Sequence, residues 1–172
     1  MATKTLVSVE DYLTMSFDGA EPEFVDGEIV ERHLPSTPHY KAQGRMLDLF
    51  RQHRERCSLY AYPEVSLRIK STRIRIADIA VFSGEGPAGE GTADIPPAVA
   101  IEVLSRDDRF TEVQKKFADY KEFGIPHIWL VDPWTRKLFS YAGGLHEVPA
   151  LELPEYGVTL TPGDVFDQRQ VS

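Results

Sequence analysis

Ala98-Val-Ala-Ile-Glu-Val-Leu-Ser105 is an apolar run with one carboxylate, Glu102, inside it. A run of this length between turn residues is typical of a strand that is covered on both faces. An ionised carboxylate in such a strand needs a counter-charge or a bound cation, because a bare charge in a low dielectric is costly. The run therefore predicts a central strand with a functional acid.

A second apolar run, Arg75–Phe82, repeats the anomaly with Asp78. Its alternation with a period of two places Asp78 on one face with Ile74, Ile76 and Ala80. Two acids in two apolar strands are what a metal site requires. Each acid alone also has a structural interpretation, as a carboxylate that caps backbone groups or pairs with an arginine.

Length and composition predict one soluble globular domain over residues 1–172, with an acidic extension at 145–172. The formal charge of -8 argues against a nucleic-acid-binding coat of positive charge but leaves room for a basic groove. Cys57 is the single cysteine, so a reducing compartment is expected. Residues 1–20 lack a secretory pattern, and no apolar run is long enough to span a membrane. We therefore expect a cytoplasmic protein with no membrane partner.

The N-terminal part predicts a short helix over 8–16 and then a hairpin over 21–32. Ser8 is placed to cap the helix, and Asp26-Gly27 is a strong hairpin-turn signal. A longer helix is expected from Thr37, as its N-cap, to about Arg54, with Pro38 at the first helical position.

The inward face of that helix is predicted to hold Met46, Leu47 and Phe50. The helical period places Gln43 and His39 on the same face, nearer the N-terminus. His39 is then either a site residue or a histidine that satisfies a backbone carbonyl. The outward face is expected to carry the basic residues Lys41, Arg45, Arg51 and Arg56.

Another helix is predicted from about Arg109 to Phe123, capped by the segment 105–108 and ended by Gly124. Lys116 lies at the edge of its inward stripe, whereas Lys115 points the opposite way. The stripe itself comprises Phe110, Val113, Phe117 and Tyr120. Further strands are expected over 59–69, 127–131 and 137–141, with short strand-like pieces at 151–153 and 158–160. The segment 83–97 is expected to be a loop because it is rich in glycine and proline.

Several blocks of the chain resemble the Uma-type family of restriction endonucleases, in the PD-(D/E)XK nuclease superfamily. The resemblance spans roughly Val9 to Tyr141 and so implies a domain core at about 9–141. Its blocks are Glu23-Phe-Val-Asp-Gly-Glu-Ile-Val30, Pro38-His39, Ile76-Ala-Asp-Ile-Ala-Val81, Ile101-Glu-Val-Leu-Ser105, Lys116-Phe-Ala-Asp-Tyr120 and Gly124-Ile-Pro-His-Ile-Trp-Leu-Val-Asp-Pro133. The resemblance implies an α/β (α+β) fold with a restriction-endonuclease-like mixed β-sheet flanked by α-helices. It also implies a divalent metal held by acids on neighbouring strands.

Two positions depart from the usual pattern. Ala77 stands where the family usually has proline before the first acid, and little loss is expected because proline is not a ligand. Leu104 stands where the superfamily usually has its lysine, two residues after the second acid. The resemblance implies that the lysine comes instead from the following helix, where Lys116 is the matching position.

The resemblance and the chemistry of phosphodiester cleavage suggest a role for each candidate. Asp78 and Glu102 are expected to bind Mg²⁺ or Mn²⁺, with the carbonyl of Val103 as a third ligand. Lys116 is expected to orient the attacking water or to stabilise developing charge. The remaining candidates ring the site as an outer shell or a phosphate contact: Glu23, His39 and, as a weaker candidate, Gln43.

These expectations support three hypotheses. The first is a metal-dependent endonuclease that hydrolyses DNA, with a homodimer needed to cut both strands. The second is a catalytically degenerate binding or interaction module, favoured by the acidic charge. The third is a phosphodiesterase that acts on RNA or nucleotides. Four arginines are interpreted as scattered surface charge and not as a DNA-binding stripe: Arg45, Arg51, Arg68 and Arg75.

Overall fold

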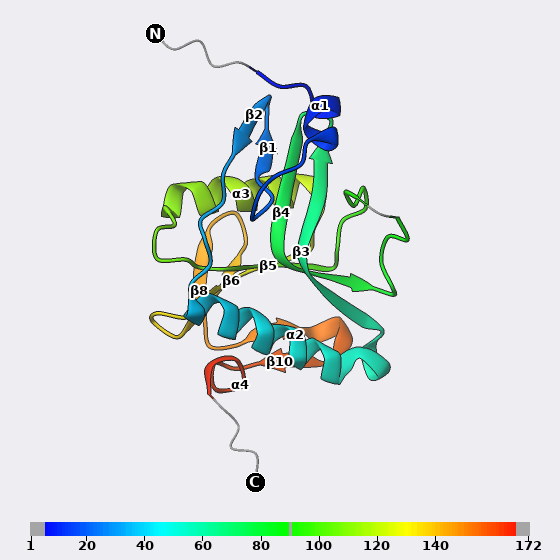
Figure 1. Cartoon of the computed structure of the whole chain (residues 1–172). Helices are drawn as coiled ribbons and strands as arrows, with labels where there is room; N and C mark the ends of the chain where they lie inside the picture. The colour runs from blue at the N-terminus through cyan, green and yellow to red at the C-terminus, as the bar shows by residue number, and fades with distance from the viewer. Residues whose placement is uncertain (1–5, 90, 168–172) are drawn as a thin grey trace.

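A mixed β-sheet lies at the centre of this computed structural model, which describes residues 6–89 and 91–167 (Figure 1). The remaining residues of the predicted span, 1–5, 90 and 168–172, lie outside the described part. Within the described residues, eight strands form one sheet. They are β1 (Glu23–Val25), β2 (Glu28–Val30), β3 (Leu59–Lys70), β4 (Arg73–Ser83), β5 (Val99–Val103), β6 (His127–Asp132), β7 (Lys137–Tyr141) and β8 (Leu145–Val148).

The strand order is β2-β1-β4-β5-β6-β7-β8, and β3 also pairs with β4. Only β5 and β6 run parallel among these pairs. The helix α3 (Phe110–Phe123) connects them, as a parallel pair requires a crossover. The strand that contains Glu102 therefore lies in the middle of the sheet, as the sequence predicted.

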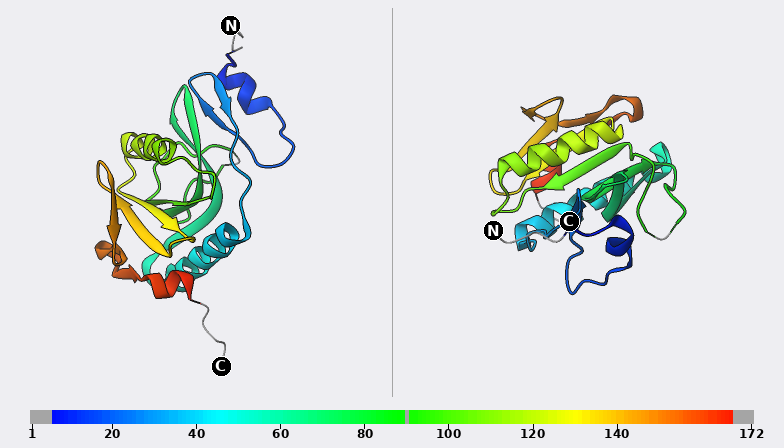
Figure 2. Two further views of the ribbon diagram at one scale, coloured as in Figure 1. Left: turned by 90° about the vertical axis from the view of Figure 1, so that its left-hand side faces the viewer. Right: turned by 90° about the horizontal axis from the view of Figure 1, so that it is seen from above.

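Helices cover both faces of the sheet (Figure 2). One face packs against α2 (Thr37–Cys57), α4 (Pro162–Phe166) and the separate pair β9 (Leu151–Leu153) and β10 (Val158–Leu160), which flanks the short 3-10 helix η1 (Pro154–Tyr156). The opposite face packs against α3 through Phe117 and Tyr120, which are fully buried. The predicted fold class, a mixed sheet flanked by helices, is confirmed.

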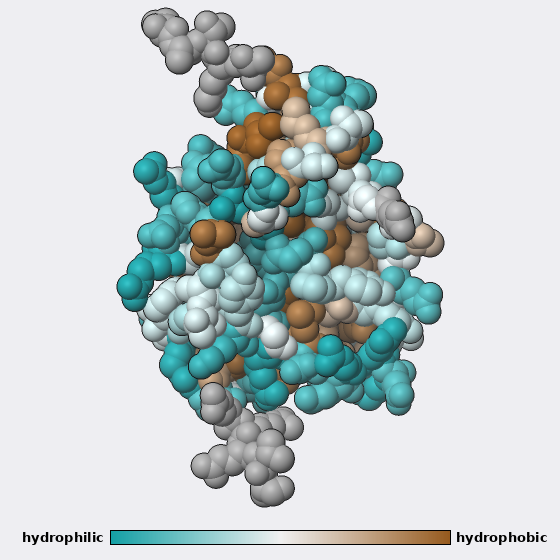
Figure 3. Space-filling view, viewed as in Figure 1, coloured by the Kyte–Doolittle hydropathy of each residue, from teal (hydrophilic) through white to brown (hydrophobic). Residues whose placement is uncertain are grey.

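The N-terminal helix α1 (Val9–Thr14) packs on the β1–β2 hairpin, where Tyr12 stacks on Phe24. Ser8 caps α1 by accepting a hydrogen bond from the backbone N–H of Asp11. The surface at this end has apolar side chains, whereas the rest of the face seen in Figure 1 is mainly hydrophilic (Figure 3).

The hairpin turn gives a first testable prediction. Gly27 has a φ of +90°, and an added Cβ would lie 3.1 Å from Cδ2 of Leu6. Gly27→Ala is therefore expected to lower stability by about 1–2 kcal/mol. Gly44 is the matched control, since it lies in α2 with open space beside it, and Gly44→Ala should raise stability by up to about 1 kcal/mol. Urea denaturation of both variants checks these opposite signs, and equal effects would contradict the argument.

Some local predictions were wrong. The N-cap of α2 is Ser36, one residue before Thr37. Asp108 does not cap α3, because its carboxylate accepts from the N–H of Ser105 and so closes the preceding loop. Phe110 is 57% exposed, since it is the first residue of α3 and lies a turn ahead of the part that packs on the sheet.

Arg45 was predicted on the outward face of α2, but it is half-buried. Its Nε donates to the carbonyl of Asp164 at 2.7 Å, so the C-terminal helix α4 covers this part of α2. The sequence analysis did not predict α4, which is only five residues long.

Candidate active site

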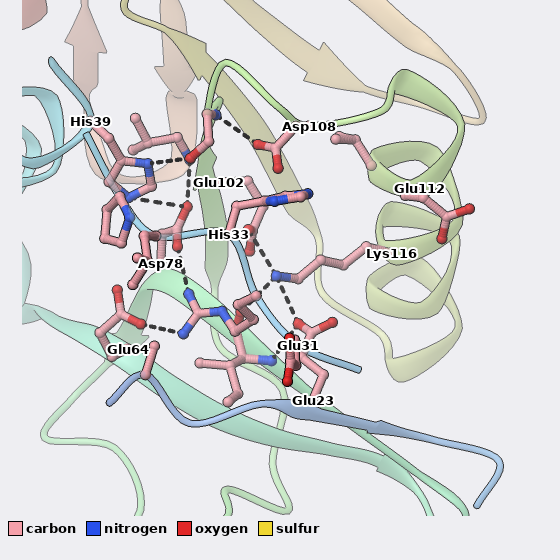
Figure 4. A pocket seen from close by; sticks show the side chains of 18 of the residues that line it. Glu23, Glu31, His33, His39, Glu64, Asp78, Glu102, Asp108, Glu112 and Lys116 are labelled. Carbon is pink, nitrogen blue, oxygen red and sulfur yellow. Dashed lines mark hydrogen bonds and ion pairs between the residues drawn. The ribbon is translucent and has the colours of Figure 1, made fainter. Parts of the chain in front are cut away.

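The predicted site residues line one pocket of about 880 Å³. Its walls come from β1, β4, β5, α3, the N-terminal end of α2 and the segment 31–35. Asp78, Glu102, Lys116, Glu23 and His39 all lie there (Figure 4). The structure thus brings together side chains that are up to 93 positions apart in the chain, from Glu23 to Lys116.

Asp78 lies where β4 and β5 begin to separate. The two strands pair through Ile79–Val81, and beyond that point the Oδ2 of Asp78 accepts from the N–H of Val103 at 2.8 Å. The period of two is interrupted here, because Ala77 and Ala80 both pack under α3. The prediction that Ile74, Ile76, Asp78 and Ala80 share one regular face was therefore too simple.

Glu102 lies beside Asp78 on the neighbouring strand β5, and only 9% of its surface is exposed. Its Oε2 is 2.8 Å from Nζ of Lys116, and its Oε1 accepts from the hydroxyl of Tyr120 at 2.6 Å. Both partners come from α3, which the β5–β6 crossover places over this strand. Tyr120 was predicted to face inward but was not recognised as a site residue.

Lys116 points from α3 into the pocket. Its Nζ lies 2.7 Å from the carbonyl of Ile76, 2.8 Å from Oε2 of Glu102 and 2.8 Å from Oε1 of Glu23. Three oxygens match the three N–H donors of an ammonium group. Lys115, by contrast, is exposed and pairs with Glu112 on the helix surface.

Glu23 is buried on β1 rather than an exposed strand residue. It accepts from the N–H of Ile76 and from Arg75, and Arg75 also pairs with Asp119 of α3. The interpretation of Arg75 as surface charge was wrong, because β1 and α3 cover that part of β4. Arg75 and Asp119 hold Glu23 where it contacts Lys116.

His39 and Gln43 reach the pocket from the first turns of α2, and both are buried. The Nδ1 of His39 is 3.2 Å from the hydroxyl of Ser105, and its Nε2 is 3.8 Å from Oδ2 of Asp78. Gln43 donates to the carbonyl of Asp78 at 2.8 Å and to the carboxylate of Glu64 at 2.9 Å.

The ion pairs of Asp78 and Glu64 with Arg32 were not predicted. The guanidinium of Arg32 bridges the carboxylates of Glu64 and Asp78, at 2.5 Å and 2.8 Å. Arg32 lies in the irregular segment after β2, where no periodic pattern applies. Glu64 has a φ of +53° within β3, and the preceding Pro63 was an available signal, since proline inside a strand marks an irregularity.

Comparison with known proteins agrees with this architecture. The sequence model of the Uma2 family, described as "Putative restriction endonuclease", matches residues 9–172. The chain belongs to this family. A solved structure from Anabaena variabilis ATCC 29413, titled a putative nuclease belonging to DUF820, superposes with a TM-score of 0.78. It is 22% identical and covers 93% of this chain and 97% of that chain, so it shows the same fold.

No curated protein matches the chain. In the part that the structure describes, no helix is both long and apolar enough to span a membrane. The description of the Uma2 family indicates a restriction-endonuclease-like nuclease. The pocket is the candidate active site of such a nuclease.

Burial and charge shift the protonation of the two central acids. Burial raises the pKa of Asp78 to about 6, against the opposing charge of Lys116. Burial also raises the pKa of Glu102 to about 8; Lys116 opposes this shift, and the charge of Asp78 adds to it. The cations Lys116 and Arg32 therefore do not fully offset the cost of burying both carboxylates in their ionised form.

The other ionisable groups of the pocket respond to the same surroundings. Burial would lower the pKa of Lys116, but the carboxylates around it, Glu102 first, raise it. Burial would raise the pKa of Glu23, but Lys116 and Arg75 lower it. Burial lowers the pKa of His39 and so disfavours its protonated form.

Restriction-endonuclease-like enzymes generally use divalent metals, which bind hard oxygen donors such as carboxylates. Within the described residues, no group of three or more His, Cys, Asp or Glu side chains is arranged to hold a metal. Two buried carboxylates on neighbouring strands nevertheless offer hard oxygen donors, and some divalent cations take only one or two protein carboxylates together with several waters. The residues fit a sparse hard-cation site and not a closed cage.

Proposed function

We propose that this chain is a Mg²⁺- or Mn²⁺-dependent endonuclease that hydrolyses phosphodiester bonds in DNA. The observation that supports it best is the meeting of Asp78, Glu102 and Lys116 in one pocket, with Nζ 2.8 Å from the Glu102 carboxylate. A purely structural trio would have little reason to line an open pocket of about 880 Å³.

In this proposal Asp78, Glu102 and the carbonyl of Val103 would hold the ion, which would neutralise phosphate charge and make a nearby water more acidic. Lys116 orients the attacking water or stabilises charge on the phosphate. The water forms the new P–O bond and gives up a proton to the solvent, the bond to the leaving oxygen breaks, and that oxygen takes up a proton from the solvent. Glu23 positions Lys116, since its carboxylate lies 2.8 Å from Nζ. His39 lies near Asp78, so it suits a phosphate or outer-water contact.

The test is cleavage of supercoiled plasmid with Mg²⁺ or Mn²⁺. The wild type is expected to nick it, and Asp78→Ala and Glu102→Ala are each expected to lower the rate at least about 10³-fold, because each removes a ligand. Arg51→Gln, a change on the exposed side of α2, is the control and should cut normally. A wild type that neither nicks plasmid nor binds either metal by calorimetry would refute the proposal. Competing DNA with RNA and with nucleotides separates DNA cleavage from the other phosphodiesterase activities.

A degenerate binding module is the second candidate, and the charge of the pocket favours it. The lining has eight carboxylates but only four lysines and arginines, a poor match to a polyanion without added cations. The acids are Glu21, Glu23, Glu31, Glu64, Asp78, Glu102, Asp108 and Glu112, and the bases are Arg32, Arg75, Arg109 and Lys116. A folded protein that neither nicks plasmid nor binds Mg²⁺ or Mn²⁺ would support this second candidate.

The proposed function also includes a homodimeric state and a location in the cytoplasm. One pocket per chain cuts one strand, so cleavage of both strands in a single encounter needs two copies. Sedimentation of the protein with and without a DNA duplex tests this part, and a monomer under both conditions predicts nicking without linear product.

A further inference from the structure

Arg32 occupies the carboxylate that the proposed function needs for its metal. One nitrogen of the guanidinium is 2.8 Å from Oδ1 of Asp78, and another is 2.5 Å from Oε2 of Glu64. Only 16% of the Arg32 side chain is exposed, so the contact is built into the pocket and not a surface pair. A guanidinium and a divalent cation compete for the same carboxylate, because both neutralise it and repel each other.

The anchor of Arg32 is itself held in an uncommon conformation. Glu64 has a φ of +53° inside β3, a region that non-glycine residues seldom adopt. The register of β3 on β4 continues on both sides, from Pro63↔Ile79 to Val65↔Ala77, so Glu64 lies across from Asp78. Backbone strain of this kind persists where surrounding structure enforces it and clusters at functional sites. Gln43 holds the Glu64 side chain beside Asp78, since it donates to both the Glu64 carboxylate and the Asp78 carbonyl.

We propose that Arg32 is an exchangeable cation of the site: it pairs with Asp78 in the metal-free protein and with a substrate phosphate once a divalent ion occupies Asp78. This inference rests on the proposed function. Glu64 keeps the guanidinium in the pocket in both states. The guanidinium nitrogen that leaves Asp78 then donates its N–H groups to an anion. A guanidinium suits this second partner because its fork matches phosphate oxygens.

Two affinities with opposite responses test the exchange. Arg32→Gln removes the competing charge but retains an amide, so Mn²⁺ affinity by calorimetry is expected to rise about tenfold. The same variant is expected to bind a fluorescent DNA duplex about tenfold more weakly in Ca²⁺, because a phosphate contact is lost. A purely structural role for Arg32 would lower both affinities. Arg51→Gln, the same change at an exposed and distant arginine, should alter neither.

Two further variants keep the test decisive where Arg32→Gln disturbs folding. Arg32→Lys preserves the charge but not the bridge, and its Mn²⁺ affinity should fall between those of the wild type and Arg32→Gln. Glu64→Gln removes a carboxylate beside Asp78 and leaves Arg32 to Asp78 alone, so Mn²⁺ affinity should fall. Circular dichroism of each metal-free variant confirms that the compared proteins are folded.

The outcomes separate this inference from the proposed function. A wild type that nicks plasmid, with an Arg32→Gln variant of unchanged or weaker Mn²⁺ affinity, overturns the exchange and leaves the nuclease assignment standing. A wild type without Mn²⁺ affinity overturns both. Tighter Mn²⁺ binding together with weaker duplex binding supports the exchange.

Discussion

Replacement of Lys116 by methionine is expected to abolish metal-dependent cleavage and to lower stability by about 3–5 kcal/mol. Methionine keeps the length and apolar volume of the stem but removes the ammonium group. The Glu102 carboxylate then loses the ammonium group 2.8 Å from its Oε2, and the Glu23 carboxylate is left with Arg75. Breaking a buried ion pair from one side is costly because it leaves uncompensated charge. Lys115→Met is the matched control, since that ammonium is exposed and should change stability by less than about 0.5 kcal/mol.

A combined variant distinguishes the structural role of Lys116 from its chemical role. Lys116→Met with Glu23→Gln and Glu102→Gln removes the two carboxylate charges that have lost Lys116, so much of the lost stability should return. Cleavage should not return, because the proposed ligand Glu102 and the proposed water-orienting group are both absent. Urea denaturation and plasmid nicking measure the two effects separately. A single variant, Lys116→Met, that is as stable as the wild type would contradict the buried ionic arrangement.

The sequence predicted that Asp78 and Glu102 lie close together, because the geometry of regular β-strands is known in advance. Glu102 and Asp78 stood out as charges inside apolar strands, and neighbouring strands of one sheet bring such positions close together. Lys116 was reachable from the helical period alone, since it lies three residues after Val113 and four before Tyr120. The resemblance to the family then linked these three positions to one site, which a single sequence pattern does not do.

The other charged residues around that site were harder to predict from the sequence. Arg75 alternates on β4 like any strand residue, and nothing local shows that β1 and α3 cover it. Its partner Asp119 lies 44 positions away, and such ion pairs depend on tertiary packing. Arg32 and Glu64 lie outside regular alternation, one in a connecting segment and one at a positive φ. Sequence periodicity describes regular backbone, so it fails where the backbone departs from it.

Metal-free protein is expected to become less stable as the pH rises from 6.5 to 8. The pKa of Glu102 is about 8 in the folded protein, because burial and then the charge of Asp78 oppose ionisation against the pull of Lys116. In an unfolded chain the same carboxyl has a pKa near 4.5. The folded state therefore binds nearly one more proton than the unfolded state at pH 6.5 and about half a proton more at pH 8, so stability falls as the pH rises. One proton over this interval corresponds to roughly 1–2 kcal/mol.

Other groups change this result little. Asp78, with a pKa of about 6, contributes a smaller change of the same sign. His39 acts in the opposite direction, since burial lowers its pKa when folded, but an unfolded histidine holds at most about half a proton at pH 6.5. Thermal melts of wild type and Glu102→Gln without metal measure the difference, and the variant should lose the slope. Saturating Mg²⁺ should also flatten the slope in the wild type, because an ion on Asp78 and Glu102 favours both carboxylates in their ionised form. A wild-type slope that persists with Mg²⁺ would place the ion away from Glu102.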